Sequence, residues 1–134
     1  MVSLHVTLLY AGFLGLLLVV LSFNLMKNWI KAVNKDLTSD TDLRRAEALV
    51  GSFTDYVPLI LILLGILEID GAPPIALHLM GGTLAVARLM HAFGSNRGTG
   101  ADGMRFLGAQ LTYLVLTIAS FACLYAYAMP LILP

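Results

Sequence analysis

The sequence predicts an all-α integral membrane protein, built as an antiparallel bundle of four transmembrane helices. Two observations indicate this class. The 134-residue chain is 59% hydrophobic and only 12% charged, a balance outside the usual range of soluble domains. All eight Lys and Arg residues also fall within two short stretches, residues 27–45 and 88–105. A soluble domain spreads such residues over its whole surface, and a net charge of zero gives no electrostatic reason to bind nucleic acid.

Four apolar runs are long enough to span a bilayer, at about residues 4–26, 46–69, 74–93 and 106–129. A hydrocarbon core of ~30 Å needs about 20 helical residues at 1.5 Å each. Helix is the expected structure because lipid offers no hydrogen-bond partner to an open strand edge. No basic residue precedes the first run and the positive charges follow it, so we expect a retained helix and not a signal peptide. Residues 1–134 then form a single four-helix domain in contact with membrane lipid.

The three connections between these runs predict the orientation of the bundle. The first, residues 27–45, and the third, residues 95–104, carry basic residues, whereas the turn at residues 69–74 carries none. In that turn Gly71 ends one helix, and Pro74 suits the first turn of the next. By the positive-inside rule the two basic loops face the cytoplasm and both chain termini face outward.

Polar residues inside the spans point to a site near the basic loops, because ionisable groups at depth cost roughly 2.5–3.5 kcal/mol each and mark function or pairing. One stripe about 100° wide on the second helix carries Arg45, Ser52, Asp55 and Tyr56. A similar stripe on the third helix carries Arg88, His91 and Ser95. Asp55 and Arg88 fall at similar depth, so we expect them to form an intramembrane ion pair. The alternative is that such a pair only fixes the register of the helices.

The segment from Arg45 to Pro58, Arg-Ala-Glu-Ala-Leu-Val-Gly-Ser-Phe-Thr-Asp-Tyr-Val-Pro, resembles a family signature. It is similar to the pattern Arg-x-x-Arg-Ala-x-x-Asn-x-x-Glu-Tyr-x-Pro of the membrane-associated proteins in eicosanoid and glutathione metabolism (the MAPEG family). The turn Leu-Glu-Ile-Asp-Gly-Ala-Pro-Pro and residues 87–92 also resemble bacterial members of this family. In length and topology the resemblance covers nearly the whole chain.

The resemblance implies a homotrimer that binds glutathione between protomers near the cytoplasmic side, here in a bacterial inner membrane. Members of the family conjugate glutathione to lipophilic electrophiles, reduce lipid peroxides, or isomerise or conjugate eicosanoids. Arg45 and Tyr56 match the motif, and Lys27 falls near a basic residue at the end of the first helix. Arg105 stands where the family has an arginine that stabilises the glutathione thiolate, so the resemblance makes it the catalytic candidate.

The chemistry of glutathione explains why these residue types would be needed. Its two carboxylates call for cations, its ammonium for an acid, and its thiol for a nearby positive charge that favours the thiolate. The candidate binding residues are Lys27, Arg45, Ser52, Asp55, Tyr56, Arg88 and His91. With one cysteine and no cluster of acids and histidines in the sequence, we expect no metal site.

Departures from the motif leave three functional classes open. The first is a glutathione-dependent membrane transferase or peroxidase acting on lipophilic electrophiles. Ala48, Ser52 and Asp55 replace the second arginine, the asparagine and the glutamate of the motif. These changes are typical of the second class, a family member with a degenerate site that serves as an accessory subunit of a larger membrane assembly. The third is a small proton-coupled exporter, in which Asp55 would carry the proton.

Overall fold

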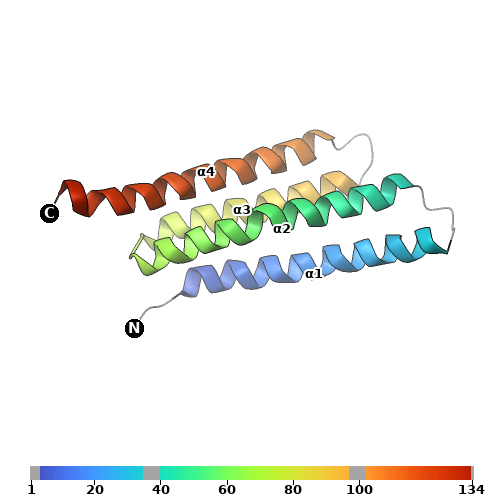
Figure 1. Cartoon of the computed structure of the whole chain (residues 1–134), viewed down its shortest axis with the longest axis horizontal. Coiled ribbons are helices and arrows are strands. Elements are labelled where there is room, and N and C mark those ends of the chain that lie inside the picture. The colour runs from blue at the N-terminus through green and yellow to red at the C-terminus, as the bar shows by residue number, and fades with distance from the viewer. Residues whose placement is uncertain (1–3, 35–39, 97–101, 134) are drawn as a thin grey trace.

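The computed structural model describes residues 4–34, 40–96 and 102–133, which form four helices. These are α1 (His5–Val33), α2 (Asp40–Ile69), α3 (Pro74–Asn96) and α4 (Asp102–Ile132). The helices alternate in direction (Figure 1), and the described residues contain no strand. All four are long and apolar enough to cross a membrane, which confirms the predicted fold class.

The helices extend beyond the expected spans, most of all at one end of the bundle. We call this the basic end: α1 and α3 finish there, and α2 and α4 begin there. α1 continues past Met26 to Val33, and α2 begins at Asp40 instead of Ala46. Hydropathy locates only the part of a helix that lies in hydrocarbon, and long polar side chains let the helix continue into the interface. The basic residues Lys35 and Arg97, used to predict the orientation, lie outside the described residues.

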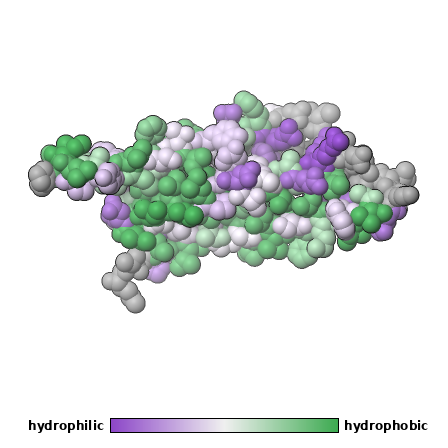
Figure 2. Space-filling view, in the orientation of Figure 1, coloured by the Kyte–Doolittle hydropathy of each residue, from purple (hydrophilic) through white to green (hydrophobic). Residues whose placement is uncertain are grey.

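α2 and α3 occupy the middle of the molecule, and α1 and α4 lie on its two flanks (Figure 1). α1 packs on α2 and α3, and α4 packs on the same two helices, but the described parts of α1 and α4 do not touch each other. The core between them is aliphatic, with fully buried Leu14, Leu49, Val57, Ile60, Leu64, Leu77 and Leu84. Most other large apolar side chains are exposed, and they give the surface its largely hydrophobic character in Figure 2. Such a surface suits lipid as its solvent.

The turn between α2 and α3 forms as the sequence predicts. Gly71 adopts a left-handed backbone with φ +91°. Its N–H donates to the Glu68 carbonyl at 3.2 Å, and the Ala72 N–H donates to the Leu67 carbonyl at 3.0 Å. This pair of hydrogen bonds is the Schellman ending of a helix, in which glycine avoids the strain of a Cβ. Pro74 is the first residue of α3. We call this end of the bundle the turn end.

Candidate functional site

Arg88 lies at the centre of the candidate site, inside the membrane-spanning part of α3. Its side chain is only 2% exposed. Nη1 donates a hydrogen bond to Ser52 Oγ of α2 at 3.2 Å, and the guanidinium carbon lies 5.3 Å from the centre of the Phe53 ring. The contact with the ring face is a cation–π interaction. Nε is buried without a hydrogen-bond partner, so the guanidinium is only partly satisfied.

The expected ion pair between Asp55 and Arg88 is wrong for the single chain. Asp55 is exposed on α2, and Arg88 binds Ser52 in its place. The reason is angular: Asp55 is at the edge of the predicted stripe, about 100° around the helix from Tyr56. That rotation turns the carboxylate away from α3 and towards the outside of the protomer. Arg88 forms no ion pair with any described residue.

His91 is one turn beyond Arg88 and is also buried, with 8% of its surface exposed. Its Nδ1 has no hydrogen-bond partner. The backbone of α4 closes this part of the site at Gly108. A Cβ built on Gly108 would lie 2.6 Å from the Ala87 carbonyl oxygen and 2.8 Å from the His91 nitrogen. Only glycine therefore allows α3 and α4 to approach so closely here.

Tyr56 contacts a residue to which the sequence assigned no role. Its ring meets that of Tyr113 on α4 edge to face, with centroids 5.3 Å apart and an interplanar angle of 76°. Tyr113 lies eight residues after Arg105, which places the two within about 80° on the surface of α4. That spacing is the signal that could have included Tyr113 in the site.

The remaining predicted residues take different positions. Arg45 is half-buried on α2, and Arg105 is exposed at the start of α4. Lys27 is exposed on α1, the flank that α4 does not touch. The side chain of Ser95 lies outside the part of the chain that the structure describes.

The structure therefore brings a partly satisfied guanidinium, a hydroxyl and a buried imidazole together within one protomer. We call Ser52, Arg88 and His91 the arginine cluster. A buried guanidinium with an unpartnered N–H fits an anionic ligand, because the ligand would satisfy both its hydrogen bond and its charge. Within the described residues, no group of three or more His, Cys, Asp or Glu side chains is placed to hold a metal ion.

Fold and site together define a small four-helix integral membrane protein with a cationic cluster near one end of its spans. A family model described as the MAPEG family matches residues 7–125. The chain belongs to this family, whose members use glutathione. Searches of the curated proteins and of the solved structures gave no match.

Proposed function

We propose that the protein is a glutathione-dependent membrane transferase or peroxidase that acts on lipophilic electrophiles. The observation that carries the proposal is the state of Arg88, a guanidinium buried in a spanning helix with no carboxylate partner among the described residues. A lone cation at that depth is costly, by roughly 2.5–3.5 kcal/mol on insertion scales. An anionic ligand offsets this cost, and glutathione carries two carboxylates.

The residues present fit such a ligand. Arg88 and Arg45 would hold its carboxylates, and the hydroxyls of Ser52 and Tyr56 would add hydrogen bonds. Arg105 would stand near the thiol, because its exposed guanidinium at the start of α4 is available to stabilise a thiolate. Bound glutathione would supply the sulfur nucleophile for conjugation or for reduction of a peroxide.

The exposed Asp55 and Lys27 support a site that two protomers of a homotrimer build together. Asp55 lies twelve residues after the start of the span Leu43–Ile69, or about 18 Å deep, on a face of α2 with exposed Leu59 and Ile62. An ionised carboxylate facing lipid there is expensive. A second copy covering this face would remove that cost, and Lys27 on the far flank would then reach a neighbour's cluster instead of its own.

Turnover measurements test the proposal directly. The protein in lipid nanodiscs would be assayed for glutathione-dependent consumption of 1-chloro-2,4-dinitrobenzene and of cumene hydroperoxide. We expect turnover that Arg105→Ala abolishes and that Arg44→Ala, which removes an exposed arginine from the same end of the bundle, leaves intact. Absence of turnover with both substrates would contradict the proposed function. Equal loss of turnover in the two variants would contradict the proposed role of Arg105.

A second candidate function is an accessory subunit with a degenerate site, in which case the protein would have no turnover of its own. It is favoured by Ala48 and Asp55, both exposed on α2 and both departing from the motif. Purification from native membranes in mild detergent separates the two candidates. A larger membrane enzyme in stoichiometric complex would support the accessory function, whereas a homotrimer alone with turnover would support the transferase.

The same proposal includes the orientation of the bundle and the membrane in which it lies. The basic end would face the cytoplasm of a bacterial inner membrane, where glutathione is available, and the turn end would face outward. Lipophilic co-substrates would reach the site from the bilayer.

A further inference from the structure

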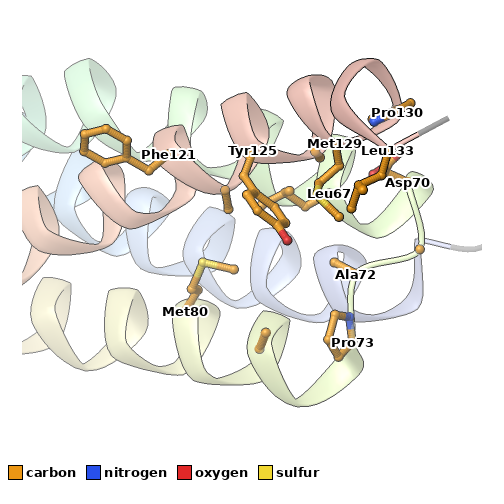
Figure 3. Close-up of a pocket in the computed structure, with 14 residues that line it drawn as sticks. Leu67, Asp70, Ala72, Pro73, Met80, Phe121, Tyr125, Met129, Pro130 and Leu133 are labelled. Carbon is orange, nitrogen blue, oxygen red and sulfur yellow. The ribbon is translucent and has the colours of Figure 1, made fainter.

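A cavity of about 780 Å³ lies at the turn end (Figure 3), and none of its lining residues belongs to the arginine cluster. It is an open hollow lined by the end of α2, the turn, the start of α3 and the last turns of α4. Its volume is within the range of small-molecule sites. The lining is mainly apolar and flexible, with Leu67, Met80, Phe121, Met129 and Leu133.

Two polar side chains join this apolar lining. Tyr125 projects from α4 into the space between α4 and α3 (Figure 3). Asp70, directly after the end of α2, is the one ionisable acid among the described residues of the lining. Among the described residues no basic side chain lines the cavity, and Asp70 forms no ion pair with any of them. The described lining therefore holds one carboxylate and no basic side chain, beside aromatic and thioether groups.

A second pocket, of about 330 Å³, adjoins the cavity on the α2–α4 side. The two share Leu67, Asp70 and Ala126, and the smaller one is also lined by Ile66 and Tyr127. Ile66 and Tyr127 are exposed on the outer surface of helices that span the membrane. A molecule dissolved in the bilayer could enter by this side without crossing water.

We propose that the cavity binds a lipophilic cation, that is, an ammonium or phosphonium carrying large apolar groups. The apolar groups pack among Met80, Phe121 and Met129, since methionine side chains adapt to irregular shapes. The positive charge lies near Asp70, and the aromatic ring of Tyr125 in the same lining can attract a cation as well. A lipophilic anion is excluded because it would meet Asp70 with no cation to offset it.

Two ions of nearly the same shape and opposite charge test this inference. Tetraphenylphosphonium and tetraphenylborate would each be titrated, by equilibrium dialysis, into the full chain in nanodiscs of zwitterionic lipid, with empty nanodiscs as the blank and no glutathione present. We expect saturable binding of tetraphenylphosphonium only. Asp70→Asn should weaken it about tenfold, given the loss of one charge contact in a weakly polar setting. Glu47→Gln, an exposed acid at the basic end of the same helix, should not change it.

A cavity-filling variant locates the binding. Ala126→Trp should abolish tetraphenylphosphonium binding, whereas Leu124→Trp, which lies on the same helix but outside the lining, should preserve it. Equal binding of both ions, or no effect of Asp70→Asn, would overturn the proposal. So would the absence of tetraphenylphosphonium binding to the unaltered protein. If Ala126→Trp then also changes the size of the oligomer, a second copy occupies the cavity instead.

Discussion

Glu68 of α2 caps the start of α1 through Thr7: its Oε2 accepts hydrogen bonds from the Thr7 N–H at 2.8 Å and from the Thr7 hydroxyl at 2.6 Å. Its Oε1 accepts a third, from the N–H of Val6 at 2.8 Å. The residue at the N-cap, Leu4, has no side chain that can do this. The first N–H groups of a helix need partners from outside it, above all where water is scarce. Glu68 therefore fixes α1 against α2 at the turn end.

Removing this cap should destabilise the protein. For Glu68→Ala we expect the free energy of unfolding to fall by about 2 kcal/mol, because two backbone donors and a hydroxyl lose a charged acceptor. Reversible unfolding of the detergent-solubilised protein by sodium dodecyl sulfate would measure it. Glu47→Ala, an exposed acid on the same helix, is the control and should change little. Equal stability of the two variants would mean that the cap contributes nothing.

Gly108 should not tolerate a methyl group. In Gly108→Ala the new Cβ meets the backbone of Ala87 and His91, which cannot move aside as a side-chain tip can. We expect a loss of about 1–3 kcal/mol in unfolding free energy from this overpacking. Gly15→Ala, at a helical glycine with nothing within 4 Å, should be neutral or stabilising. A stable Gly108→Ala protein would contradict the close approach of α3 and α4.

Substitutions at Tyr10 and Gly81 should have non-additive effects on the free energy of unfolding. The Tyr10 ring lies directly over Gly81 of α3, and its hydroxyl is 3.0 Å from Nδ1 of His78. Gly81→Ala would place a Cβ against the ring and should cost about 1–3 kcal/mol. In a Tyr10→Ala background the same change should cost much less, because the obstacle is gone. A double-mutant cycle measured by unfolding checks this, and additive effects would refute the contact.

Arg88 should serve binding at the expense of stability. Without ligand, Arg88→Met removes a lone buried cation and loses one hydrogen bond to a hydroxyl and one cation–π contact. We therefore expect the unfolding free energy to rise by about 1–2 kcal/mol. Unfolding by sodium dodecyl sulfate in the absence of glutathione measures this change in unfolding free energy. A fall of more than about 2 kcal/mol would instead mean that Arg88 is needed to hold α2 to α3.

The fold could be predicted from the sequence because the bilayer imposes it. Lipid requires helices of a fixed length, so hydropathy alone located four of them, and Gly71 with Pro74 marked the tight turn. The helix ends were less predictable, as α1 shows by continuing to Val33 through residues that suit the interface. That α1 and α4 lie on opposite flanks depends on packing, which hydropathy does not record.

The candidate site could be predicted only in part. Spacing placed Ser52 and Arg88 near the same end, and the structure brings them into contact. The spacing in the sequence could not show that Asp55 turns outward, because a residue at the edge of a stripe can face either side. Nor could it pair Tyr56 with Tyr113, since that contact depends on how closely α4 approaches the other helices.

The central claim is that the arginine cluster binds glutathione, and titration of glutathione into the purified protein tests it most directly. Binding would be measured by calorimetry and then by equilibrium dialysis with radiolabelled glutathione. The second measurement also detects binding that releases no heat. We expect saturable binding with a free energy of about −8 to −4 kcal/mol, which corresponds to a micromolar to millimolar Kd. Arg88→Met should lose it and Arg44→Ala should keep it. No binding up to about 10 mM glutathione, or unchanged affinity in Arg88→Met, would contradict the claim.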